Sequence, residues 1–131
     1  MCDDGDRCTA DQCVGGECAH QALEDVPAVT CRLDTLAADL QSAAADDLGG
    51  SGAQKKYVKQ IGGVHRTVDA AGPPGNARAR KKFKRAGRQL QAFINGVTRG
   101  QRRHKITVGL GDRLLKTAND AKGVILPFQK P

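Results

Sequence analysis

Apolar residues recur at alternating intervals of four and three along most of the chain, which is the period of an amphipathic helix. The first stripe consists of Val29, Leu33, Leu36, Leu40 and Ala43. With three later stripes it predicts helices over about 27–48, 53–71, 77–99 and 107–126. Four amphipathic helices with short connections favour an antiparallel four-helix bundle, so we expect an all-α fold.

Glycine- and proline-rich turns separate the predicted helices. Residues 49–52 read GGSG and residues 72–76 read GPPGN, and both sequences break a helix. Ser51, with Gln54 three residues later, has the pattern of a capping box at the start of the second helix. Asn76 is expected to cap the third helix.

Residues 1–25 have a different composition, with too few apolar side chains to form a core. Four cysteines within 17 positions, Cys2, Cys8, Cys13 and Cys18, indicate a loop-like module held by disulfides, ahead of a helical domain at 26–131. Spacing does not determine their pairing. We favour Cys2–Cys13 with Cys8–Cys18, which leaves Cys31 unpaired, paired outside the chain, or competing for Cys18.

Two metal sites are alternatives for this head. A zinc site would use the cysteines with His20, but the tight C-x2-C pair that is typical of such sites is missing. A calcium site would use the carboxylates of Asp3, Asp4, Asp6 and Asp11. Calcium prefers such oxygen ligands, but the EF-hand order is not met, and turn-forming aspartates would give the same pattern. No other cofactor is expected.

Disulfides imply an oxidising compartment, so we expect a secreted or cell-surface protein. Met1 is followed directly by Cys2, with no signal peptide between them. We therefore expect the chain to be a piece of a longer exported protein.

The net charge of +7 conceals a division along the chain. Residues 1–48 hold eleven of the 14 acidic residues and only two bases, whereas residues 49–131 hold nineteen of the 21 bases and three acids. The bases gather in the third predicted helix and in the turn after it. These candidate polyanion-binding residues are Arg78, Arg80, Lys81, Lys82, Lys84, Arg85, Arg88, Arg99, Arg102, Arg103 and Lys105.

Such a field would attract nucleic acid, acidic polysaccharide or anionic lipid. Base-stacking aromatics are nearly absent, which argues against recognition of single strands by stacking. The alternative is a solvated face whose charge is partly balanced by acids of the first helix: Asp34, Asp39, Asp46 and Asp47.

Catalytic patterns are missing. His20, His65 and His104 are scattered and accompany no nucleophile motif, and no phosphate-binding glycine loop is present. No apolar run approaches the length of a membrane span. We therefore expect no enzyme activity, no small-molecule substrate and no membrane span.

The head, CDDGDRCTADQCVGGECAH, resembles the Cys- and Asp-rich modules of exported proteins from environmental bacteria such as myxobacteria. The body, which opens with Cys31, Leu33 and Leu36 in a C-x-L-x-x-L pattern, is similar to basic helical segments that follow such modules. In that family a cysteine of the last helix can pair with the one at the start of the body, and this chain has no cysteine after Cys31.

The resemblance implies a location and an architecture more than an activity. From it and from the residues we expect a non-catalytic structural or interaction module that associates with a protein or with its own copies. Polyanion binding and calcium binding are the two alternative functions.

Overall fold

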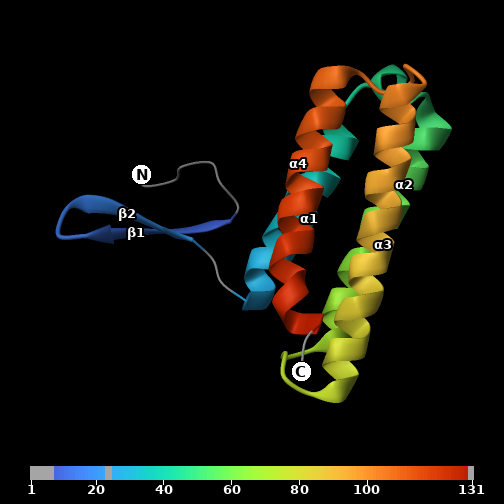
Figure 1. The fold of residues 1–131 in the computed structure, drawn as a ribbon. Helices are drawn as coiled ribbons and strands as arrows, with labels where there is room; N and C mark the ends of the chain where they lie inside the picture. The colour runs from blue at the N-terminus through green and yellow to red at the C-terminus, as the bar shows by residue number, and fades with distance from the viewer. Residues whose placement is uncertain (1–7, 23–24, 130–131) are drawn as a thin grey trace.

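The computed structural model of the chain describes residues 8–22 and 25–129 as a helical bundle with a β-hairpin at its side (Figure 1). The elements in chain order are β1 (Thr9–Val14), β2 (Glu17–Ala22), α1 (Asp25–Ser42), the 3-10 helix η1 (Ala45–Leu48), α2 (Ser51–Ala71), α3 (Ala77–Arg102), α4 (Val108–Ile125) and the 3-10 helix η2 (Leu126–Gln129).

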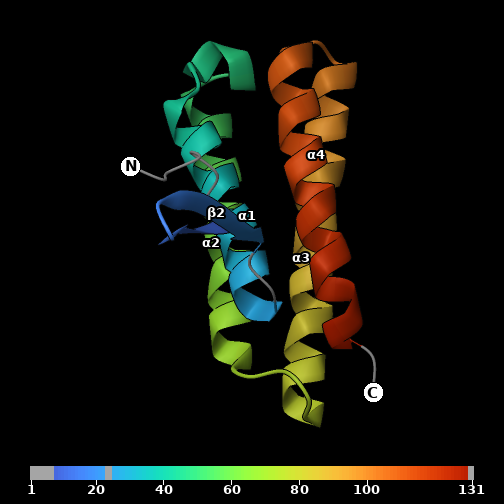
Figure 2. The same cartoon turned by 90° about the vertical axis from the view of Figure 1, so that its left-hand side faces the viewer.

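Each long helix packs against two others: α1 contacts α2 and α4, and α3 contacts α2 and α4. Figure 2 shows the helix pair α1 and α2 beside the pair α3 and α4. The four helices that the apolar stripes predict are therefore present and form a bundle.

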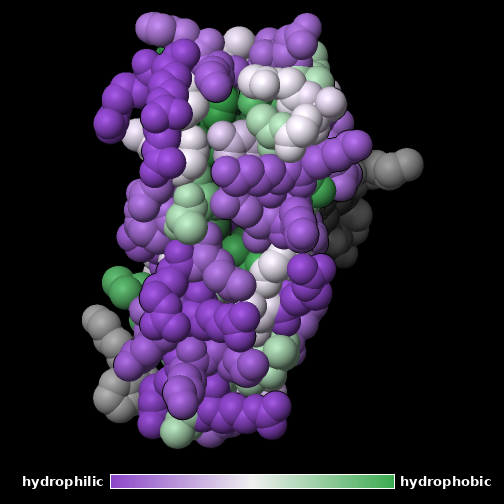
Figure 3. Space-filling model, turned by 90° about the vertical axis from the view of Figure 1, so that its right-hand side faces the viewer, coloured by the Kyte–Doolittle hydropathy of each residue, from purple (hydrophilic) through white to green (hydrophobic). Residues whose placement is uncertain are grey.

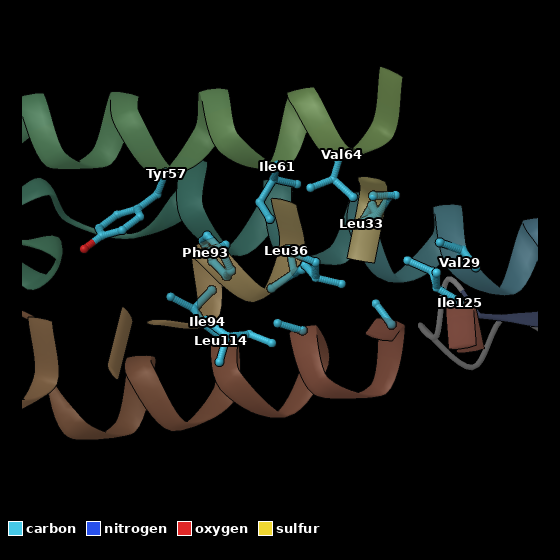
Figure 4. Packing of buried hydrophobic residues seen from close by; sticks show 14 of the residues in the cluster. Val29, Leu33, Leu36, Tyr57, Ile61, Val64, Phe93, Ile94, Leu114 and Ile125 are labelled. Carbon is cyan, nitrogen blue, oxygen red and sulfur yellow. The ribbon is translucent and has the colours of Figure 1, made fainter. Parts of the chain in front are cut away.

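The four stripes meet in one core (Figure 4). Leu33 and Leu36 of α1, Phe93 of α3 and Leu114 of α4 are fully buried. Burying each such side chain contributes about 1.5–3 kcal/mol of transfer free energy. Phe93 also meets Tyr57 edge to face, with the ring centroids 5.8 Å apart. Packing between helices thus stabilises the fold.

The predicted cap of the third helix is confirmed, and the predicted capping box of the second is wrong. The side-chain oxygen of Asn76 accepts a hydrogen bond from the Ala79 N–H at 2.8 Å. The residue that precedes α2 is Gly50, which has no side chain to cap it. Gln54 instead donates through Nε2 to the carbonyl oxygens of Leu40 at 2.7 Å and Ala43 at 3.0 Å. It therefore satisfies carbonyls near the end of α1.

The first helix is shorter than the predicted 27–48. It ends at Ser42, whose hydroxyl donates to the Ala38 carbonyl at 2.8 Å. Residues 45–48 continue as η1, which Gly49 closes with a φ of 90°. Only glycine adopts this left-handed conformation without strain. Leu48 of η1 remains part of the core.

The sequence predicts a loop-like head, but the structure shows two strands there. Strands β1 and β2 form an antiparallel hairpin in which Cys13 is opposite Cys18. Gly15 and Gly16 form its turn with φ values of 57° and 83°. Two consecutive positive φ values are what a two-residue I′ turn requires, and glycine supplies both without strain. The all-α expectation therefore holds for the bundle and fails for residues 9–22.

The favoured disulfide pairing is also wrong. Cys8 is bonded to Cys31, with Cα atoms 5.2 Å apart and 23 residues between them in sequence. This bond excludes Cys8–Cys18, and it excludes an unpaired or externally paired Cys31. Cys18 is disulfide-bonded as well. Spacing could not reveal this arrangement, because it depends on the path of the hairpin past α1.

Candidate functional site

Basic side chains from two helices gather on the face where α2 lies beside α3. This α2/α3 face contains Lys56, Lys59, Arg66, Arg99, Arg103 and Lys105. Figure 3 looks onto it and shows hydrophilic side chains bordering a seam of paler and greener residues. The sequence of α3 contains no acidic residue, so its bases have no carboxylate on their own helix.

The one acidic residue of α2 faces away from this seam. Asp69 contacts His65, with 2.9 Å between Oδ2 and Nδ1, and the other ring nitrogen lies 3.4 Å from Asp34 of α1. These three residues form a polar cluster between α1 and α2. Of the four acids predicted to balance the basic charge, Asp34 and Asp39 lie on α1, and Asp39 is 3.7 Å from Arg113 of α4. Asp46 and Asp47 belong to η1 instead of α1.

A first depression, the middle hollow, lies halfway along the α2/α3 face. It has a volume of about 360 Å³ and is lined by Lys56, Lys59, Gln60, Gly63, Arg66, Gln89 and Ala92. The Oε1 atoms of Gln60 and Gln89 are buried without a hydrogen-bond partner. Each such unpaired acceptor costs about 1–3 kcal/mol.

A second depression, the upper hollow, lies where α2 begins and α3 ends, at the top of Figure 1. It has a volume of about 220 Å³ and is lined by Leu48, Gly49, Ala53, Lys56, Tyr57, Gly96, Arg99, Gly100, Arg103 and Lys105. Its wall is formed by small, aliphatic and aromatic residues, and its rim is basic. Lys56 borders both hollows, and we call the two hollows together the basic track.

The structure divides the eleven predicted polyanion-binding residues into two groups. Arg99, Arg102, Arg103 and Lys105 are exposed at the upper end. The group at 78–88 lies near the start of α3, and its centre is roughly 30 Å away at 1.5 Å per residue. Most of that group is exposed, but Arg80 and Lys82 are half-buried. Because the seven bases occupy consecutive turns of a helix, they point in several directions and do not form one patch.

The contribution of α2 was not predicted from the sequence. Lys56, Lys59 and Arg66 lie on the flank of α2 that borders α3, between the two groups of α3 bases. Lys56 and Lys59 form a cluster with Lys55 in the sequence, but the cluster alone does not show which side of α2 borders α3. A signal was present in their spacing of three and seven, which places them beside the Tyr57–Ile61–Val64 core stripe.

The predicted metal sites gain no support. Asp3, Asp4 and Asp6 lie outside the described residues, and Asp11 belongs to β1 with its side chain outside the description. Within residues 8–22 and 25–129, no group of three or more possible ligands could hold a metal ion. Cys8, Cys18 and Cys31 are disulfide-bonded and so carry no thiolate for zinc.

The remaining features are consistent with a face rather than an enclosed site. His65 belongs to the α1/α2 cluster and His104 follows α3, so the two lie on different elements. In the part of the chain that is described, no helix is long and apolar enough to cross a bilayer.

Comparison of the chain with protein families, curated proteins and solved structures gives no match.

Proposed function

We propose that the chain is a non-catalytic interaction module of an exported bacterial protein, and that its α2/α3 face binds an extended acidic polysaccharide. The observation that carries the proposal is the convergence of bases from two helices on one face, with no carboxylate among the residues that line its two hollows. Such a field raises the local concentration of a polyanion and is weakly screened at short range.

The arrangement of the helices supports an elongated binding track. We take the bundle to be antiparallel, because α2 and α3 are joined by a turn at residues 72–76 and Figure 1 shows them running in opposite directions. In that order Lys56 lies near Arg99, while Arg66 lies toward Gln89. The bases of α3 and of the connection to α4 then lie at the upper end of the track, and those of α2 continue it toward the middle hollow.

An acidic polysaccharide fits better than a nucleic acid. The Cys8–Cys31 disulfide fits an extracellular protein, and acidic polysaccharides are abundant outside cells. Stacking of bases needs exposed rings, but Phe83 and Phe93 are fully buried and Tyr57 is 8% exposed. We also infer from the disulfides and from the resemblance of the head that the protein is secreted or displayed at the cell surface.

A salt titration of binding to heparin tests the proposal, with neutral dextran as the control polymer. If about six bases contact the polymer, affinity falls about a thousandfold between about 50 and 200 mM salt. Absence of heparin retention at low salt would overturn the proposal. Binding to duplex DNA without binding to any sulfated or uronate polysaccharide would overturn the choice of polymer.

A further inference from the structure

The upper hollow has the features of a discrete anion site within the basic track. Its four bases come from three segments: Lys56 from α2, Arg99 from α3, and Arg103 and Lys105 from the connection to α4. A run of charge on one helix is an ordinary solvated surface. Bases from separate segments around one depression require the tertiary fold to assemble them.

Among the described residues, none of these four bases belongs to an ion pair. Four uncompensated cations around one small volume repel one another. A bound anion removes that repulsion and gains charge-assisted hydrogen bonds, which are about twice as strong as neutral ones.

One of the two helix ends at this hollow favours an anion. Helix α2 begins there after Gly50, and no side chain caps its first-turn N–H groups, which carry the positive end of the helix dipole. The end of α3 carries the opposite partial charge, and the carbonyl oxygens of Arg99 and Gly100 there are already hydrogen-bonded. Arg103 N–H donates to Arg99 at 3.0 Å and Lys105 N–H donates to Gly100 at 2.9 Å.

Tyr57 forms part of the wall of the hollow. Figure 4 shows it at one end of the core, with its hydroxyl directed away from Ile61 and Leu36. That hydroxyl lies 3.4 Å from the Gly96 carbonyl, a long distance for an O–H donor. Burial raises the pKa of Tyr57, and the positive charge of Arg99 opposes the rise. The hydroxyl therefore remains a donor at neutral pH and lies within the field of Arg99.

The volume limits what can enter. At about 220 Å³ the upper hollow is smaller than the roughly 300–1,000 Å³ of typical small-molecule sites. It is several times larger than the roughly 30 Å³ that one water molecule occupies. Gly96 and Gly100 line it without side chains, and a Cβ at either position would make an ordinary van der Waals contact with Tyr57 at 3.5 Å. This volume is ample for an anionic group with its nearest waters.

We propose that the upper hollow binds one tetrahedral oxyanion, a sulfate or phosphate group carried by the polymer, through Lys56, Arg99, Arg103 and Lys105. The inference deepens the proposed function and rests on it for the source of the group. It predicts that the preferred polysaccharide is sulfated or phosphorylated rather than only carboxylated.

Tyr57 provides the test, because it is the sole tyrosine of a chain without tryptophan. Its absorbance and fluorescence are recorded while sodium sulfate, sodium phosphate, sodium acetate or sodium chloride is added at constant ionic strength. We expect a saturable change with sulfate or phosphate, and the tighter of the two identifies the group. We expect no saturable change with acetate or chloride.

Two matched pairs of variants separate a site from general charge. Lys56→Gln and Arg103→Gln each remove one rim base, and we expect the oxyanion affinity to fall about tenfold, as loss of one charge-assisted hydrogen bond predicts. Lys55→Gln and Lys116→Gln remove bases that line neither hollow, and they should stay within about twofold of the parent.

Equal losses of oxyanion affinity in the rim variants and in the control variants would overturn the inference. So would the absence of a saturable change with either oxyanion. Heparin binding that persists with no response of Tyr57 to free sulfate or phosphate would overturn the anion site and leave the proposed function standing. Loss of both would overturn the two together.

Discussion

Cys8 is joined to Cys31 by a disulfide that fixes the start of the hairpin to the second turn of α1, with the two Cα atoms 5.2 Å apart. Cys31 is buried at 5% exposure, so the attachment point is part of the packed body. A two-stranded hairpin alone is marginally stable in water. The bond therefore gives the hairpin a defined place beside the bundle.

This pairing predicts a specific peptide map. Digestion of the unreduced protein with trypsin and a glutamate-specific protease separates residues 8–17 from residues 25–32 in sequence. We expect these two peptides to remain covalently joined until reductant is added. Fragmentation between Cys8 and Cys13 assigns the sulfur that carries the bond. Recovery of the 25–32 peptide with a free or differently linked Cys31 would contradict the pairing.

The core predicts a large effect at Phe93. This ring is fully buried and meets Tyr57 edge to face. Phe93→Ala should lower the free energy of unfolding by about 3–5 kcal/mol, measured by urea denaturation. Phe93→Leu is the control, and it should cost clearly less because most of the volume is kept. A loss below about 1 kcal/mol for the alanine variant would be inconsistent with this packing.

The helices could be predicted because their apolar stripes are unbroken, and burial of a stripe is what stabilises a helix in water. The strands could not, because residues 9–14 and 17–22 contain few apolar residues and no clear alternation. One signal was available. Gly15 and Gly16 form the dipeptide that favours a tight hairpin turn, and it lies between two cysteines that the register places opposite each other.

Only part of the candidate face could be predicted, because the sequence shows runs of charge but not how the helices pack. Runs of bases in α3 are visible in sequence, but a run distributes its charges around a helix. The face depends on which flank of α2 meets α3, and that follows from packing. Lys56 and Arg66 are therefore found only once Tyr57 and Ile61 are known to point into the core.

Replacing two helical glycines with alanine should change the free energy of unfolding in opposite directions. A Cβ on Gly62 meets no atom within 4 Å, so Gly62→Ala should raise the free energy of unfolding by up to about 1 kcal/mol through helix propensity. A Cβ on Gly100 would lie 2.6 Å from Ile106 Cδ1, so Gly100→Ala should lower it by about 1–3 kcal/mol, the usual cost of overpacking. Thermal unfolding of both variants measures the two signs. Stabilisation by both would argue against the close approach at Gly100.

Alkaline titration should show the buried tyrosine. Burial raises the pKa of Tyr57 above its ordinary 10.0, so absorbance at the tyrosinate band should have its midpoint above that value in the folded protein. Folding favours the neutral form of Tyr57. The contribution of this preference to the free energy of unfolding is fully present below pH 10 and is lost as the pH rises through the folded pKa. Arg99→Gln should raise the midpoint further, since the opposing positive charge is removed. A midpoint at or below 10.0 would contradict the burial.

The central claim is that the α2/α3 face, rather than net charge, binds the polymer. The direct test compares the salt dependence of heparin affinity in two double variants of equal net charge. Lys59→Gln with Arg66→Gln removes two bases of the face, and Lys55→Gln with Lys116→Gln removes two that lie outside its hollows. We expect the first variant to lose about two units of the slope of log affinity against log salt, and the second to keep the parent slope. Equal losses in the two variants would contradict the claim.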